Sequence, residues 1–104
     1  MMTSIDSSAR DEMYQAVVAA VDAAVAGTHL GVKNIDDIRA VEVTGIRVEA
    51  YVLVPAAGEF EVSLWRADRQ SPYRTARTGE LGEAVRMAVE GAVGGRRRTA
   101  AHRG

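Results

Sequence analysis

Apolar and polar side chains alternate with a period of two between residues 41 and 64, and no other feature constrains the fold as strongly. The apolar residues stand at odd positions up to Val43 and at even positions from Ile46 to Val54, with Gly45 at the change. Because successive side chains of a strand point to opposite faces, a shift of one position moves the buried side to the other face. We therefore predict two strands separated at Gly45 by a β-bulge or a sharp corner.

A third strand is predicted from Glu59 to about Arg66, and the loop before it decides how it pairs. A four-residue loop over 55–58 would place Val54 opposite Glu59 and mix apolar with charged side chains. A three-residue loop over 56–58 suits a type I turn that ends with Gly58 in a left-handed conformation. This loop gives one clean apolar face, with the pairs Val54–Phe60, Val52–Val62 and Ala50–Leu64.

Two amphipathic helices flank these strands. Apolar residues recur at helical spacing over residues 9–26 and again over residues 80–93. Gly27 and Gly94-Gly95 follow the two helices, and Thr78 can cap the start of the second one. Residues 28–38 are predicted as a loop with a helical turn near its end, and a fourth strand over residues 73–77 is left open.

The order of these elements predicts an α+β fold, a two-layer sandwich with the order α-β-β-β-(β)-α. In it a three- or four-stranded antiparallel sheet carries two helices on one face. A length of 104 residues allows one such domain over residues 8–95, with residues 1–7 as a disordered leader and residues 96–104 as a flexible basic tail.

The order helix, three strands, helix is similar to that of a double-stranded RNA-binding domain. That family has a lysine-rich segment at the start of its second helix, which binds phosphates. Here the corresponding stretch, residues 78–83, contains Glu80 and Glu83 and no basic residue, so the similarity is not extended to RNA binding.

The residue patterns of common enzymes and metal proteins are missing. Without cysteine, no disulfide, thiolate zinc site or cysteine nucleophile can form. His29 and His102 have no partner at metal-ligand spacing, and Asp36-Asp37 is interpreted as a solvated turn. We therefore expect a protein without catalytic residues, metal or cofactor. No run of about 20 apolar residues or signal peptide is found, so a cytoplasmic location without a membrane partner is expected.

One surface with a possible function follows from the predicted register. If the even positions of the second and third strands face the helices, Tyr51, Leu53 and Trp65 face outward. Aromatic residues are enriched at protein interfaces, and a solvated sheet face is usually more polar. We predict that these three residues bind a protein partner or a second copy. The alternative is that the leader, residues 28–38 or the C-terminal segment covers them.

A second surface follows from the charge distribution. Residues 1–64 carry four basic and ten acidic side chains, whereas residues 65–104 carry nine basic and four acidic ones. Arg96, Arg97, Arg98 and Arg103 lie in the tail, and arginine clusters bind phosphate backbones. The sequence therefore predicts a non-enzymatic interaction or assembly module that uses the outer sheet face. A nucleic-acid-associated regulator that uses the arginine-rich C-terminal half is the alternative.

Overall fold

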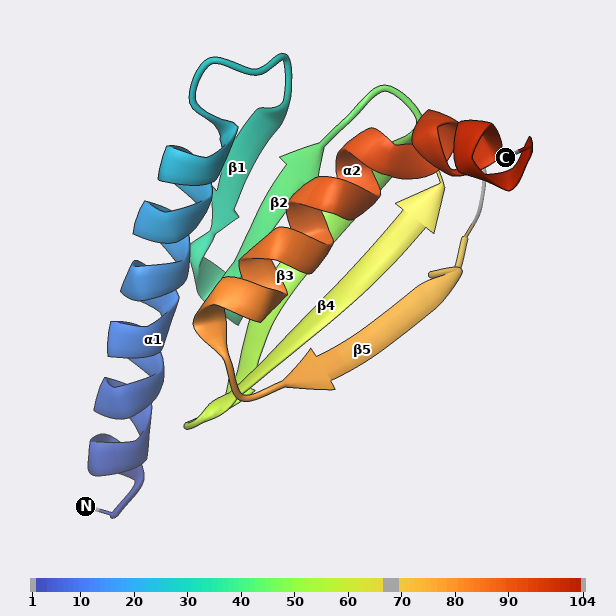
Figure 1. Cartoon of the computed structure of the whole chain (residues 1–104). Coiled ribbons are helices and arrows are strands. Elements are labelled where there is room, and N and C mark those ends of the chain that lie inside the picture. The colour runs from blue at the N-terminus through green and yellow to red at the C-terminus, as the bar shows by residue number, and fades with distance from the viewer. Residues whose placement is uncertain (1, 67–69, 104) are drawn as a thin grey trace.

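The alternating segments form the middle of a five-stranded antiparallel sheet with the strand order β1-β2-β3-β4-β5 (Figure 1). The computed structural model describes residues 2–66 and 70–103, and the side chains of residues 8–66 and 70–93. The elements are α1 (Met2–Val25), β1 (Gly31–Ile35), the 3-10 helix η1 (Asp36–Ile38), β2 (Ala40–Thr44), β3 (Val48–Ala56), β4 (Glu59–Arg66), β5 (Arg74–Thr78) and α2 (Leu81–Arg103).

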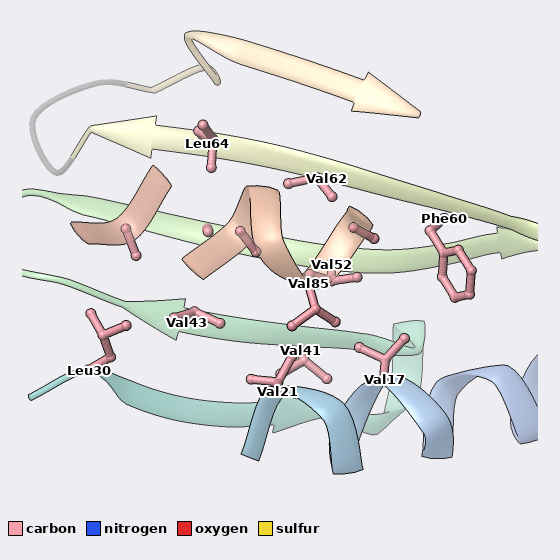
Figure 2. Close-up of a cluster of buried hydrophobic side chains, with 14 of the residues drawn as sticks. Val17, Val21, Leu30, Val41, Val43, Val52, Phe60, Val62, Leu64 and Val85 are labelled. Carbon is pink, nitrogen blue, oxygen red and sulfur yellow. The ribbon is translucent and has the colours of Figure 1, made fainter. Parts of the chain in front are cut away.

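Both helices pack on one face of this sheet, which confirms the predicted two-layer α+β fold. Helix α1 lies over β1, β2 and β3, whereas α2 crosses β2 to β5, and the two helices contact each other. Figure 1 shows α2 in front of the sheet and α1 at the left, alongside β1. The core between the layers consists largely of small side chains, and its largest fully buried members are Val17, Val21, Val41, Val43, Val52 and Val54. Figure 2 shows several of them with Phe60, Val62 and Val85 from the sheet and α2.

The sheet has one strand more than the sequence predicted, because part of the predicted loop forms the edge strand β1. Its residues pair with β2 from Gly31–Thr44 to Ile35–Ala40. An edge strand needs backbone hydrogen bonds on one side only, and just two of the five β1 residues are partly buried. A hydrophobic alternation is therefore weak there. The helical turn that was expected at the end of the loop is η1, and the optional fourth strand is β5. With five strands, the element order departs from that of a double-stranded RNA-binding domain.

Glycines form the corners between the strands as predicted. Gly45 forms a sharp corner in which its N–H donates to the carbonyl oxygen of Val48 at 2.9 Å. Gly58 has a φ of +83°, which is the left-handed conformation expected for it. The predicted pairs Val52–Val62 and Ala50–Leu64 are confirmed. The predicted pair Val54–Phe60 and the three-residue loop were wrong, because the register shifts between Leu53 and Ala56 and Ala56 pairs with Glu59. The hairpin therefore aligns the apolar residues of β3 and β4 on the face that the helices cover.

Both helices are longer than predicted. Helix α1 begins at Met2 rather than near Ala9, and α2 continues past Val93 to Arg103. No glycine or proline interrupts residues 2–8, and serine is only moderately unfavourable in a helix. In α2, Gly94-Gly95 cost about 1 kcal/mol each relative to alanine, but arginine and alanine, the best helix formers, follow them. Helical backbone therefore replaces the predicted leader over residues 2–7 and the predicted tail over residues 96–103.

Candidate functional site on the outer face of the sheet

The face of the sheet opposite the helices carries the three residues that the sequence singled out. Tyr51 and Leu53 alternate with the buried Ala50, Val52 and Val54 of β3, and Trp65 follows the buried Leu64 of β4. All three side chains are partly exposed. The segments proposed as a cover form α1, β1 and α2 instead. Within the part of the chain that the structure describes, both helices lie on the other face, so the outer face is open.

An aromatic pair forms the centre of this face. The rings of Tyr51 and Trp65 meet edge to face, with centroids 6.2 Å apart and planes inclined at 73°. The indole Nε1–H of Trp65 donates to Ser63 Oγ at 3.2 Å, and Ser63 is only 7% exposed. Ser63 also lies opposite Tyr51 in the β3–β4 register. Edge-to-face contact and a hydrogen bond to a buried partner hold both rings in fixed positions, so little ordering is needed before they bind something.

Two carboxylates flank the hydroxyl group of Tyr51. This hydroxyl donates to Glu42 Oε2 at 3.3 Å, across the β2–β3 pair. Burial raises the pKa of Tyr51, and the negative charges of Glu42 and Glu49 raise it further. Both effects disfavour the charged phenolate, burial more strongly than the two neighbouring carboxylates. Among the described residues, neither Glu42 nor Glu49 has an ion-pair partner within 4.0 Å.

A short apolar row lies beside the aromatic pair. Ile35 of β1, Ala40 of β2 and Leu53 of β3 stand side by side in register. Ala40 is fully buried, whereas Ile35 and Leu53 are partly exposed. Near the β5 edge of the same face, Arg77 contacts Glu59 at 3.0 Å and Glu61 at 3.1 Å. The outer face thus carries an aromatic pair, an apolar row and charged residues side by side, and aromatic residues are enriched at protein interfaces. We call Ile35, Glu42, Glu49, Tyr51, Leu53 and Trp65 the outer patch.

Three members of the outer patch, Ile35, Glu42 and Glu49, were not among the binding residues predicted from the sequence. Ile35 was missed because β1 was expected to be a loop. Glu42 could have been found, because it lies between Val41 and Val43, whose predicted burial places Glu42 on the outer face. Its position beside Tyr51 depends on the register between β2 and β3, which the sequence did not specify because Gly45 could form either a bulge or a corner.

The other sequence candidates do not assemble into a catalytic or metal site. Asp36 accepts a hydrogen bond of 2.6 Å from the hydroxyl of Tyr14, which is 4% exposed. Burial, followed by this hydrogen bond and the charge of Asp36, raises the pKa of Tyr14 to about 12. Asp36 therefore holds α1 to the β1–β2 connection. Asp37 and His29 are exposed, and the described residues contain no group of three potential metal ligands.

Side chains just before and within the first turn of α2 form hydrogen bonds at the start of this helix. Thr78 Oγ1 accepts from the Glu80 N–H at 3.1 Å and donates to a Glu83 carboxylate oxygen at 3.0 Å. Thr78 therefore forms a turn before the helix and is not its predicted cap, because α2 begins at Leu81 and its first hydrogen bond runs from the Ala84 N–H to the Glu80 carbonyl oxygen. The glutamates make this helix start unsuitable for an anion. At the other end of α2, the side chains of Arg96, Arg97, Arg98, His102 and Arg103 lie outside the described residues.

A groove of about 380 Å³ lies between the two helices. It is lined by Ala24 of α1 and by Gly82, Val85, Arg86, Val89 and Glu90 of α2. Arg86 and Glu90 form an exposed ion pair at 3.5 Å. No other polar side chain lines the groove, so it lacks the converging polar groups typical of a small-molecule site.

Comparisons with known proteins give no assignment for this chain. No protein-family model matches it, and searches of the curated proteins and of the solved structures find no match either. None of the described helices is both long and apolar enough to cross a membrane.

Proposed function

We propose that this chain is a small, non-enzymatic interaction module that binds a protein partner through the outer patch. The observation that carries this proposal is the Tyr51–Trp65 pair, held by hydrogen bonds on an open sheet face. Tyrosine and tryptophan are enriched among the residues that dominate binding energy at protein interfaces. A face that only met solvent would be expected to carry polar side chains at these positions. A cytoplasmic location for the module stays a prediction.

A second copy of the chain is one form that the partner can take. The core contains mainly valine and alanine, which bury little area each, so additional burial at an interface would stabilise the fold. Sedimentation equilibrium over a range of protein concentrations distinguishes the two forms. A mass that stays monomeric assigns the outer patch to a different protein, whereas a dimer lost on Trp65→Ser substitution assigns it to a second copy.

Site-specific photo-crosslinking in the cells that produce the protein tests the proposal. One variant carries a photoreactive amino acid at Leu53, in the outer patch, and the matched control carries it at Ala23, an exposed position of α1. We expect a discrete protein adduct from position 53 that position 23 does not give. Equal adducts from both positions, or none from position 53, would refute the proposal.

The nucleic-acid alternative rests on the arginines of residues 96–103 and stays a prediction. It is tested by titrating mixed-sequence DNA and RNA at low salt into the full chain and into a variant truncated after Gly95. Binding that weakens on truncation and steeply with added salt would support it. Identical curves for the two proteins would exclude these arginines as phosphate contacts.

A further inference from the structure

The outer patch combines aromatic rings with carboxylates in a way that specifies the chemistry of its partner. Glu42 lies on β2 beside Tyr51, and Glu49 lies on β3 directly opposite Trp65. Both carboxylates are partly buried, and neither forms an ion pair within the described residues. Lys33 of β1 stands opposite Glu42 in the strand register but forms no ion pair with it, so both carboxylates can pair with an arriving cation.

The carboxylates near the β5 edge have a different kind of partner. There, the single guanidinium group of Arg77 contacts Glu59 at 3.0 Å and Glu61 at 3.1 Å. At the centre of the face Glu42 instead accepts the Tyr51 hydroxyl. A hydrogen bond from a neutral phenol leaves the full negative charge of the carboxylate in place. The partly exposed rings and the negative charge therefore lie at the same point of the surface.

We infer that the outer patch binds an arginine-bearing segment of a protein partner, with one guanidinium group stacked on the Tyr51–Trp65 pair and paired with Glu42 or Glu49. This inference rests on the proposed function and names its partner by chemistry. A guanidinium group suits this place better than an ammonium group. It is planar, is more weakly hydrated, stacks on aromatic rings and forms two parallel hydrogen bonds with a carboxylate.

The test uses a blocked, fluorescein-labelled peptide of alternating arginine and serine, together with lysine–serine and glutamate–serine peptides of equal length. Fluorescence anisotropy measures binding to the full chain at low salt, and the emission of Trp65, the only tryptophan, reports contact at the patch. We expect the arginine peptide to bind at least threefold more tightly than the lysine peptide and to change Trp65 emission. The glutamate peptide should not bind.

Variants that replace a carboxylate by a neutral amide test which glutamates bind the arginine peptide. Glu49→Gln should weaken binding of the arginine peptide about threefold to tenfold, and the double variant with Glu42→Gln about tenfold or more, as expected for partly exposed ion pairs next to aromatic rings. The matched control is Glu12→Gln, which removes one carboxylate from an exposed position of α1 and should leave the affinity unchanged. Circular dichroism and urea midpoints verify that all three variants are folded.

Several results would overturn the inference. They are equal affinity for the arginine and lysine peptides, equal losses in Glu49→Gln and Glu12→Gln, and binding that leaves Trp65 emission unchanged. A dimeric mass abolished by the double variant would assign the patch to a second copy instead. If position 53 crosslinks to a protein but no arginine peptide binds, this inference fails while the proposed function stands. Without that crosslink, the proposed function fails as well.

Discussion

Substitution of Gly45 by alanine provides a strict test of how α2 is seated on the sheet. A Cβ atom at this position would lie 2.2 Å from the carbonyl oxygen of Ala92 and 3.2 Å from that of Val48. An ordinary contact needs more than 3 Å, so the corner and the α2 backbone would have to separate by about 1 Å, a strain comparable to overpacking a core. Neither partner is a flexible side chain that can rotate away.

The expected cost follows from two opposing terms. Overpacking of this kind costs roughly 1–3 kcal/mol. Alanine restricts the unfolded chain more than glycine does, which offsets about 0.4–1 kcal/mol of this cost. We therefore expect Gly45→Ala to lower the free energy of unfolding by about 1–2 kcal/mol, measured by urea unfolding with circular dichroism and Trp65 emission. The matched control is Gly82→Ala in α2, where a Cβ meets nothing within 4 Å.

The Gly82→Ala control should leave the free energy of unfolding unchanged or raise it by up to about 1 kcal/mol, because alanine is a better helix former than glycine. A Gly45→Ala variant that is as stable as the wild type would refute the close seating of α2 on the β2–β3 corner. A destabilised Gly82→Ala variant would show that alanine substitution as such, rather than the contact with Ala92, explains the loss.

Three further predictions concern single contacts. Because folding raises the pKa of Tyr14 from 10.0 to about 12, its contribution to stability is complete below pH 10 and is lost as the pH rises from 10 to 12. The loss amounts to about 3 kcal/mol, and in urea unfolding Tyr14→Phe should lack this part of the alkaline decline. Ser63→Ala removes the buried acceptor of the Trp65 indole and should cost about 1 kcal/mol, with a measurable shift of Trp65 emission; an unchanged spectrum would contradict the contact. Arg86→Ala breaks an exposed ion pair with Glu90 and should change the unfolding free energy by less than about 0.5 kcal/mol; a larger change would indicate a role in packing.

The part of the fold that the sequence predicts is the part with strong periodicity. In β2, β3 and β4 one face is fully buried, so the alternation of residues 41–64 was enough to obtain the strands and the pairs from Val52–Val62 to Ala50–Leu64. The edge strand β1 could not be found in the same way. Its pairing depends on backbone hydrogen bonds to β2, and Lys33 and Asn34 of β1 are both exposed.

The helix ends show a second limit of sequence analysis. Glycine pairs usually end helices, and Gly94-Gly95 therefore predicted the end of α2. Each glycine disfavours the helix by only about 1 kcal/mol, which the arginines and alanines that follow can offset. Local propensities of this size do not decide between a continued helix and a tail.

For the outer patch, the sequence predicted which residues share a face but not how they interact. The period of two together with the predicted β3–β4 register places Tyr51, Leu53 and Trp65 on one face. The hydrogen bond from Tyr51 to Glu42 depends on the pairing of β2 with β3, and the packing of Ile35 depends on β1. The contact of Glu42 with Tyr51 therefore became evident only from the structure.

The central claim is that the outer patch binds a protein, and the affinity of the captured partner tests it most directly. The partner crosslinked at position 53 is purified, and isothermal titration calorimetry measures its binding to the wild type, to the Tyr51→Ala/Trp65→Ala double variant and to Ala23→Ser as a control on α1. We predict at least a tenfold loss of affinity for a folded double variant and no change for the control. Unchanged affinity in a folded double variant would contradict the claim.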